Sequence, residues 1–409
     1  MKFRDYQLNI IQEGKSILQN HKLLYLSMEV RTGKTLTSLG ICKELNIENV
    51  LFITKKKAIS SIETDYNMYA PSFYLETINY ESLHKISDKN WDVIICDEAH
   101  GMGAFPKPSK RAKTVKELIQ NYQPYVILMS GTPTPESFSQ MYHQVYGVPG
   151  NPFSKHKSFY KFASEYVKIV QKKINGYNIN DYSKGLAEIV EEMKPYTISY
   201  SQREAGFKST INEKVLFVPI SDNITNIVST LRKDLVYEID GEYILGDTAV
   251  KLMMKMHQLY SGTVKFESGK RIVLDLSKAK FIKEKFDGQK IGIFYKFQAE
   301  LTALREVFGD NLCTTLEEFD STDKNIALQI VSGREGISLR KADFLVYYNI
   351  DFSATSYWQS RDRMTTKERM HNNIYWIFSE KGIEKMIYKA VNSKKDYTLR
   401  HFKRDYAIY

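Results

Sequence analysis

Short apolar runs alternate with longer helical patterns along this chain, and this alternation restricts its possible folds more than any other feature. In the amino-terminal part the runs lie at 23–28, 49–54, 91–96 and 125–130. The alternation resumes at about 277, with strand patterns at 290–295, 326–331, 343–349 and 372–378. Such runs are typical of parallel strands covered by helices on both faces. The sequence therefore predicts an α/β fold with two parallel sheets.

The first apolar run leads into a possible phosphate-binding loop. It is followed by Gly33-Lys34-Thr35 and then directly by a helical pattern, which is the context that such a loop requires. Backbone N–H groups and the helix dipole would face the phosphates. Lys34 would reach the outer phosphates of ATP, and the Thr35 hydroxyl would bind Mg²⁺. Met28 stands where the usual loop has its first glycine. The residues expected to contact ATP in this loop are Arg31, Thr32, Gly33, Lys34 and Thr35.

A second motif, Asp97-Glu98-Ala99-His100, closes another apolar run. At the end of a strand, Asp97 is placed to hold the metal ion, and Glu98 to act as general base on the attacking water. Gly-Lys-Thr occurs by chance in many loops, and Asp-Glu after a strand is often only a solvated strand end. Together and in order, the two motifs predict an enzyme that hydrolyses a nucleotide.

These motifs, with others further along, resemble the ordered signatures of superfamily 2 helicases and translocases. Asp97 to His100 resembles their second signature, in the DEAH form, and Ser130-Gly131-Thr132-Pro133 resembles the third. The Ser-Gly-Thr-Pro form of the third signature resembles the form found in Swi/Snf-type motors, which also lack the first glycine of the loop. In its short length the chain resembles a compact, phage-type motor. Segments 333–339 and 359–363 resemble the fifth and sixth signatures. The resemblance extends from residue 3 to about residue 365.

The resemblance implies two RecA-like lobes with helical insertions, which hydrolyse ATP with Mg²⁺ while acting on nucleic acid. By the same resemblance, the amino-terminal segment and the fifth signature would add ATP contacts from Arg4, Gln7 and Gly336.

The sixth signature would supply an arginine that neutralises charge on the transferred phosphoryl group. The family pairs a glutamine with arginines four and seven residues later. Here Arg363 follows Gln359 at the first spacing, and Thr366 stands at the second. Arg361 is an additional arginine. Because residues i and i+2 of a helix do not share a face, we expect Arg363 to act in catalysis. Arg361 is expected to pair with an acidic group or to touch nucleic acid.

A formal charge of +10 suits a polyanionic partner. Residues 151–175 contain six lysines and one glutamate, interleaved with aromatic residues. We expect the lysines to contact a phosphate backbone, the alternative being a solvated face, and most of the aromatics to lie in a core instead of stacking on bases. Candidates for nucleic-acid contact are Thr54, Lys55, Lys56, Ser130, Thr132, Lys168, Lys172, Lys173, Ser332 and Gly333.

The expected organisation is a nucleotide-binding lobe at 1–150, a basic helical insertion at 151–214, a helical and hairpin element at 215–276, and a second lobe with a basic tail at 277–409. The three cysteines form no CxxC pair, and we expect buried thiols in a reducing compartment. Without a secretory leader or an apolar stretch of spanning length, we expect a cytoplasmic monomer with no membrane partner, in a bacterium or a phage-infected cell.

Three functions remain open at this point. The favoured one is a DNA-dependent ATPase that acts as a translocase or helicase and unwinds, branch-migrates or anneals DNA. The second is an ATPase or helicase that moves along RNA instead of DNA. The third is a nucleotide-gated nucleic-acid clamp with weak hydrolysis, which the intact Lys34, Asp97 and Glu98 argue against.

Overall fold

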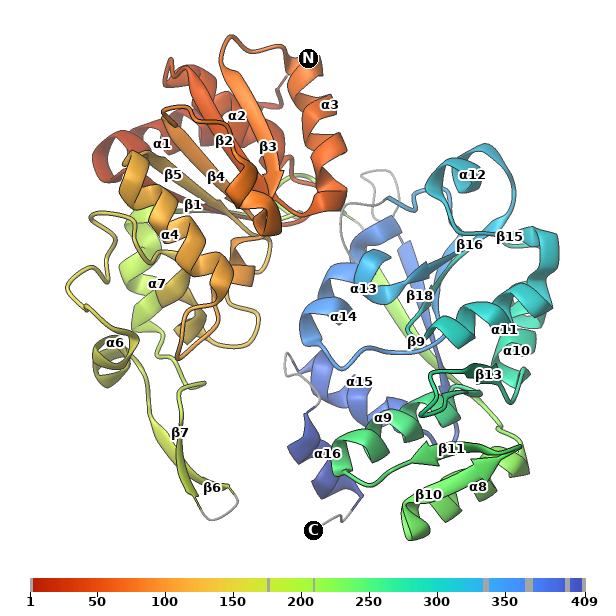
Figure 1. The fold of residues 1–409 in the computed structure, drawn as a ribbon. Coiled ribbons are helices and arrows are strands. Elements are labelled where there is room, and N and C mark those ends of the chain that lie inside the picture. Colours follow the sequence, from red (N-terminus) through yellow and green to blue (C-terminus); the bar gives the residue numbers. More distant parts are fainter. Residues whose placement is uncertain are drawn as a thin grey trace. The chain divides into compact units, whose positions relative to one another are not determined.

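The computed structural model describes residues 3–174, 177–208, 210–333, 338–364, 371–393 and 398–406. The chain divides into two compact units, Met1–Phe207 and Lys208–Tyr409. Each unit contains a six-stranded parallel sheet covered by helices (Figure 1). This confirms the predicted fold class, an α/β protein built from two RecA-like parallel-sheet lobes.

The sheet of unit 1 contains all four strands predicted in the amino-terminal part. In spatial order its strands are β3 (Tyr74–Asn79), β2 (Asn49–Thr54), β4 (Val93–Asp97), β5 (Tyr125–Met129), β1 (Leu23–Met28) and β8 (Thr197–Tyr200). The helices of unit 1 are α1 (Asp5–His21), α2 (Lys34–Glu44), α3 (Ile59–Tyr69), α4 (Lys110–Tyr122), α5 (Met141–Gln144), α6 (Phe159–Tyr166) and α7 (Glu188–Met193).

Two apolar cores enclose this sheet, one on each face. Side chains of α1, α2 and α3 pack with Leu24 and Leu26 of β1 in one core. Side chains of α4 to α7 pack with Leu23 and Tyr25 of the same strand in the other core. This alternation along β1 follows from the two-residue period of a strand. Burial on both faces explains why these strands read as continuous apolar runs.

The segment 151–214, expected as a basic helical insertion, is helical only in part. Besides α6 and α7 it contains a two-stranded antiparallel ribbon, β6 (Val170–Ile174) and β7 (Tyr177–Asp181), and the edge strand β8. Strand β8 pairs in parallel with β1. The aromatics that we expected in a core are buried, except Tyr160, which is 52% exposed; the buried ones are Phe153, Phe159, Phe162 and Tyr166.

The sheet of unit 2 contains the strands predicted for the carboxyl-terminal part. In spatial order it consists of β15 (Leu312–Cys313), β16 (Asn325–Gln329), β14 (Ile291–Tyr295), β17 (Phe344–Tyr347), β18 (His371–Ser379) and β9 (Thr210–Val218). Strand β9 pairs with β18 along its whole length, although the two lie far apart in sequence.

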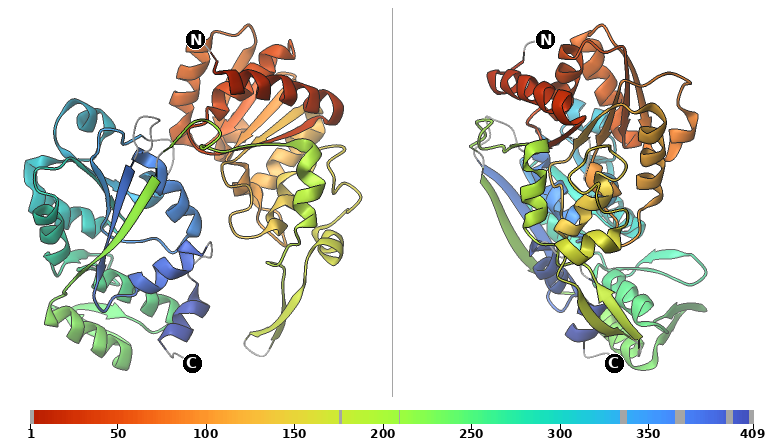
Figure 2. Two further views of the ribbon diagram at one scale, coloured as in Figure 1. Left: turned by 180° about the vertical axis from the view of Figure 1, so that it is seen from behind. Right: turned by 90° about the vertical axis from the view of Figure 1, so that its left-hand side faces the viewer.

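The remaining elements of unit 2 are helices and two hairpins (Figure 2). A turn at Asp240-Gly241 joins β10 (Val236–Ile239) to β11 (Glu242–Leu245), and β12 (Thr263–Lys265) pairs with β13 (Arg271–Val273). The helices are α8 (Asp222–Asp234), α9 (Ala249–Tyr260), α10 (Ser277–Lys285), α11 (Gln298–Phe308), α12 (Leu316–Ser321), α13 (Ile330–Gly333), α14 (Ala354–Ser360), α15 (Glu384–Asn392) and α16 (Leu399–Asp405).

The three cysteines, Cys42, Cys96 and Cys313, are free and buried, as expected. Within the described ranges, no helix is both long enough and apolar enough to cross a membrane.

Candidate functional site

Three of the predicted motifs follow neighbouring strands of the first sheet. Strand β4 lies beside β5, and β5 beside β1, all in parallel. The loop 29–33 follows β1, Asp97 ends β4 and is followed by Glu98, and Ser130 follows β5. Because the carboxyl ends of parallel strands meet at one edge, the structure brings these motifs together where α/β proteins bind nucleotides.

The loop before α2 depends on left-handed backbone conformations. Arg31 has φ 64° and Gly33 has φ 84°. The φ of Gly33 favours glycine, and a Cβ atom there would also lie 2.5 Å from Nε2 of Gln7. The hydroxyl of buried Thr32 donates to the Glu29 carbonyl oxygen at 2.7 Å. The loop therefore has a defined shape although the first glycine of the usual pattern is absent.

Lys34 is the first residue of α2. Its ammonium group donates to the carbonyl oxygens of Met28 at 2.8 Å and Glu29 at 3.2 Å. Thr35 follows within the first turn and is half-buried. Both side chains are thus at a helix N-terminus, where backbone N–H groups and the helix dipole favour phosphate.

The amino-terminal segment packs against the same loop. Gln7 is buried, and its side-chain amide donates to the carbonyl oxygen of Gly33 at 3.4 Å and to Oγ1 of Thr37 at 3.3 Å. The backbone N–H of Arg4 donates to Oε1 of Gln7 at 3.0 Å. These bonds hold Arg4 and Gln7, both expected ATP contacts, beside the phosphate-binding loop.

Asp97 is half-buried at the end of β4. The Thr54 hydroxyl donates to its Oδ2 at 2.8 Å. Burial, and next the neighbouring Glu98, raise the pKa of Asp97 to about 6, while Thr54 and the Lys34 ammonium oppose this rise. The Asp97 carboxyl group is therefore partly desolvated and lies beside a second carboxyl group, so that a bound cation would favour its charged form.

A Mg²⁺ ion fits this charge distribution, because it would neutralise the Asp97–Glu98 pair. Asp97 and the hydroxyl of Thr35 would hold it, with phosphate oxygens and waters as the usual remaining ligands of this metal. Bound there, the ion would stabilise charge that develops on the phosphate oxygens. The described residues include no cluster of three or more His, Cys, Asp or Glu side chains able to hold a metal by themselves.

Glu98 also has a left-handed backbone, with φ 50° and ψ 44°. For a residue with a side chain this conformation costs about 1–3 kcal/mol, and it persists where neighbouring groups enforce it. The carboxylate lies 3.2 Å from Nδ1 of buried His100, and the same nitrogen lies 2.9 Å from the Ser130 hydroxyl. His100 therefore connects the expected general base to the motif that follows β5.

The turn at Ser130 packs closely against the end of β1. The backbone N–H of Thr132 donates to the Ser130 hydroxyl at 3.1 Å. A Cβ atom at Gly131 would lie 3.4 Å from the carbonyl oxygen of Met28, the same oxygen that accepts from Lys34. The motif that begins at Ser130 thus lies against the end of β1 and bonds to His100, between the other two motifs.

The unit 1 candidates for nucleic-acid contact differ in exposure. Thr54 and Ser130 are fully buried and bond to Asp97 and His100, so in this structure they support the nucleotide site. Lys56, Lys168 and Lys173 are exposed, whereas Lys55 and Thr132 are half-buried. Only the backbone of Lys172 is described, within β6.

The candidates of the fifth and sixth motifs lie in unit 2. Ser332 and Gly333 belong to α13 and Gln359 to α14, and their side chains are outside the described part. Gly336 lies outside the described residues. Arg363 is buried, and its carbonyl oxygen accepts a 2.8 Å bond from the N–H of Leu339.

Arg361 follows α14 in a short 3₁₀ helix, Arg361–Met364. Its guanidinium forms an ion pair with Glu213 of β9. It also lies over the rings of Tyr357, at 4.9 Å, and Trp358, at 4.6 Å. The same Glu213 carboxylate accepts from Tyr357 at 2.9 Å and from the indole N–H of Trp376 at 2.8 Å. Arg361 is thus held inside unit 2 by a shared carboxylate and two aromatic rings.

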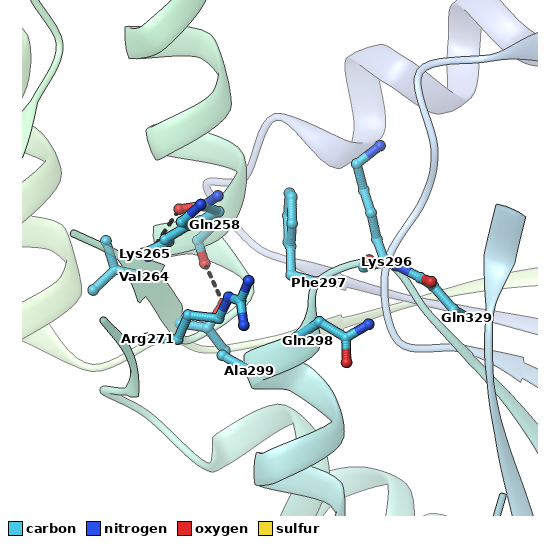
Figure 3. A pocket seen from close by; sticks show the side chains of 10 residues that line it. Gln258, Val264, Lys265, Arg271, Lys296, Phe297, Gln298, Ala299 and Gln329 are labelled. Carbon is cyan, nitrogen blue, oxygen red and sulfur yellow. Dashed lines mark hydrogen bonds between the residues drawn. The ribbon is translucent and has the colours of Figure 1, made fainter. Parts of the chain in front are cut away.

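A pocket of about 200 Å³ lies in unit 2 between α9, the β12–β13 hairpin and the start of α11 (Figure 3). Lys265 and Arg271 line it from the hairpin, and Lys296 lines it from the residue after β14. Lys296 also forms an ion pair with Asp351. The Gln329 amide donates to the Lys296 carbonyl oxygen at 3.1 Å, which joins the pocket to the strand that leads into α13.

Two tyrosines beside the loop were not among the residues predicted from the sequence. Tyr6 stacks on Tyr200 with ring centroids 4.6 Å apart, and its hydroxyl donates to the Thr32 carbonyl oxygen at 3.0 Å. The N–H of Gln202 donates to the Glu29 carboxylate at 2.7 Å. Tyr200 belongs to β8, an edge strand without a continuous apolar run, so its position depends on a pairing distant in sequence.

Several known proteins are similar to this chain. The model of the SNF2-related domain matches residues 23–274. No curated protein sequence matches the chain. Two solved structures of the Sulfolobus solfataricus SWI2/SNF2 ATPase core are similar to it. The one in complex with dsDNA has 15% identity and a TM-score of 0.43, covering 96% of this chain and 91% of that chain. The other has 16% identity and a TM-score of 0.43, covering 96% and 89%.

Proposed function

Because this chain belongs to the SNF2-related family, we propose that it is an ATP-dependent DNA translocase that moves along DNA or remodels it. Membership of this family implies an ATPase. The observation that carries the proposal is the convergence of Lys34, Asp97 and Glu98 at one edge of the first sheet. A family member that had lost hydrolysis would have no need to keep all three side chains there.

The contacts within unit 1 support a role for each side chain in this proposal. Lys34 would bind the outer phosphates as a point charge, and Asp97, oriented by Thr54, would hold the metal ion. Glu98 would take the proton of the attacking water. His100, which lies within 3.2 Å of the Glu98 carboxylate, would position it.

The test is an ATPase assay on the full chain with single-stranded, duplex and forked DNA and with RNA. We expect ATP hydrolysis to rise severalfold or more when DNA is added, because binding of DNA is proposed to activate the catalytic groups. Greater stimulation by RNA would make RNA the track. Binding of DNA that depends on ATP but proceeds without turnover would identify a nucleotide-gated clamp.

Salt dependence gives a second prediction. DNA affinity is expected to fall steeply with salt, since each phosphate contact releases counterions and contributes about −0.9 to the logarithmic slope. Replacing Lys168, Lys172 and Lys173 together by glutamine should flatten the slope, measured as Kd at several salt concentrations. Lys155→Gln is a matched control from the same segment, because Lys155 already pairs with Glu165 at 2.9 Å. An unchanged slope in the triple variant would place the track elsewhere and leave these lysines as a solvated face.

A further inference from the structure

The β6–β7 ribbon extends away from the other elements of unit 1 (Figures 1 and 2). Its two strands form a sheet of their own, with antiparallel register from Val170↔Asp181 to Ile174↔Tyr177. Because side chains alternate along a strand, every second residue of β6 lies on one face of the ribbon, together with the residues of β7 that pair with it. These are Gln171 and Lys173 of β6 and their partners Asn180 and Asn178 of β7.

This face is polar throughout, and all four of its side chains are exposed. Three of them are amides, which both donate and accept hydrogen bonds, and the fourth is a lysine. The opposite face includes Ile179, which is 48% exposed. A two-stranded ribbon gains little stability by itself. The polar face of the ribbon is therefore better suited to contact a polar partner than to pack against the rest of the protein.

The base of the ribbon is held firmly on unit 1. The N–H of Lys168 donates to the Lys184 carbonyl oxygen at 2.9 Å, and the Ser139 hydroxyl donates to the Tyr182 carbonyl oxygen at 2.7 Å. A Cβ atom at Gly185 would lie 2.5 Å from the backbone nitrogen of Ser139. The two backbones are thus in direct contact, and the ribbon is anchored at a defined place.

The ribbon is anchored on the chain segment that follows the turn at Ser130. Ser139 lies in the 3₁₀ helix Phe138–Gln140, directly before α5. From α5, the Gln144 amide donates to the carbonyl oxygens of Pro133 at 2.8 Å and Gln140 at 3.2 Å. The ribbon base therefore rests on residues that are bonded to the motif beside the nucleotide site.

We propose that this ribbon enters the major groove of duplex DNA with its amide-bearing face toward the base edges. The proposal rests on the proposed function, which makes DNA the track. A major groove about 12 Å wide admits a two-stranded ribbon. The ribbon has five residue pairs, which span about 17 Å.

The chemistry of the face matches the groove. Asparagine and glutamine amides pair with the donor and acceptor of adenine, and a lysine pairs with the acceptors of guanine. Lys168 and Lys184, both exposed at the ribbon base, complement the flanking phosphates. Single-stranded DNA presents no groove, so duplex DNA is the partner that these observations favour.

The experiment measures the affinity of the full chain for a fluorescent duplex and for a single strand of the same sequence. The variant Gln171→Ala/Asn178→Ala/Asn180→Ala keeps the net charge. It should bind the duplex at least about tenfold more weakly, since the loss of even one amide–base pair costs about that factor, and it should bind the single strand almost unchanged. Ile179→Ala, on the opposite face, is the matched control and should bind like the parent protein. Melting temperatures check that each variant is folded.

Competition on the unaltered protein gives an independent readout. Methyl green, which occupies the major groove, should displace the protein, whereas distamycin, which occupies the minor groove, should not. Unchanged duplex affinity in the triple variant, an equal loss on single strands, or displacement by distamycin alone would each overturn the proposal. If duplex DNA still stimulates ATP hydrolysis in those cases, the proposed function stands. If no nucleic acid stimulates hydrolysis in the parent protein, the proposed function fails instead.

Discussion

Glu98→Gln is expected to lower kcat for ATP hydrolysis by about 10²–10⁴-fold while ATP binding is retained, because an amide cannot accept the proton of the attacking water. The left-handed backbone of Glu98 and the 3.2 Å contact with His100 fix the position of the carboxylate. Glutamine has the same shape and can keep these contacts. A loss of turnover would therefore reflect lost chemistry and not a displaced loop. Single-turnover hydrolysis and binding of a fluorescent ATP analogue separate the two effects.

Lys34→Ala is the companion variant with a different expected signature. It should abolish hydrolysis and also weaken ATP binding, since the outer phosphates lose their mobile cation at the start of α2. Normal turnover by Glu98→Gln would mean that another carboxylate is the base. In that case Asp97, whose pKa is raised to about 6, would be the next residue to test.

Arg363→Ala is expected to cost far more ATPase activity than Arg361→Ala, with little effect on ATP affinity. An arginine that stabilises the transferred phosphoryl group contributes about 10³–10⁵ in rate in related enzymes. The structure gives Arg361 another task, because its guanidinium pairs with Glu213 and lies over Tyr357 and Trp358. Of the two arginines, Arg363 is therefore the one that we propose for catalysis. The measurement is kcat of each single variant at saturating DNA.

Thermal unfolding provides the matching readout for Arg361. Arg361→Ala should destabilise unit 2 by about 1–3 kcal/mol, because it leaves the Glu213 carboxylate without its cation. The loss is limited because Glu213 keeps its bonds from Tyr357 and Trp376. A variant that instead remains fully stable but loses catalysis would identify Arg361 as the catalytic arginine and show that the Gln359 spacing misled the prediction.

The sequence alone determined the inner strands of both sheets and the order of the nucleotide-binding motifs. Continuous apolar runs such as 23–28 and 125–130 reveal buried strands, because a strand covered on both faces needs apolar side chains at every position. The loop ending in Lys34 and the Asp97-Glu98 pair could be recognised for a similar reason, since their chemistry requires fixed residues at a strand end. Local patterns of this kind are complete within a few residues.

Tertiary structure decided what depends on partners distant in sequence. The edge strands β3 and β8 lack continuous apolar runs, since Tyr74 and Ser199 are exposed, and only their pairing with β2 and β1 makes them strands. That the Thr54 hydroxyl donates to Asp97 also depends on the packing of β2 beside β4. The ion pair of Arg361 with Glu213 depends on the pairing of β9 with β18 across most of unit 2. Periodicity shows which face of an element is buried, but the residue that meets it is set by the packing of the whole lobe.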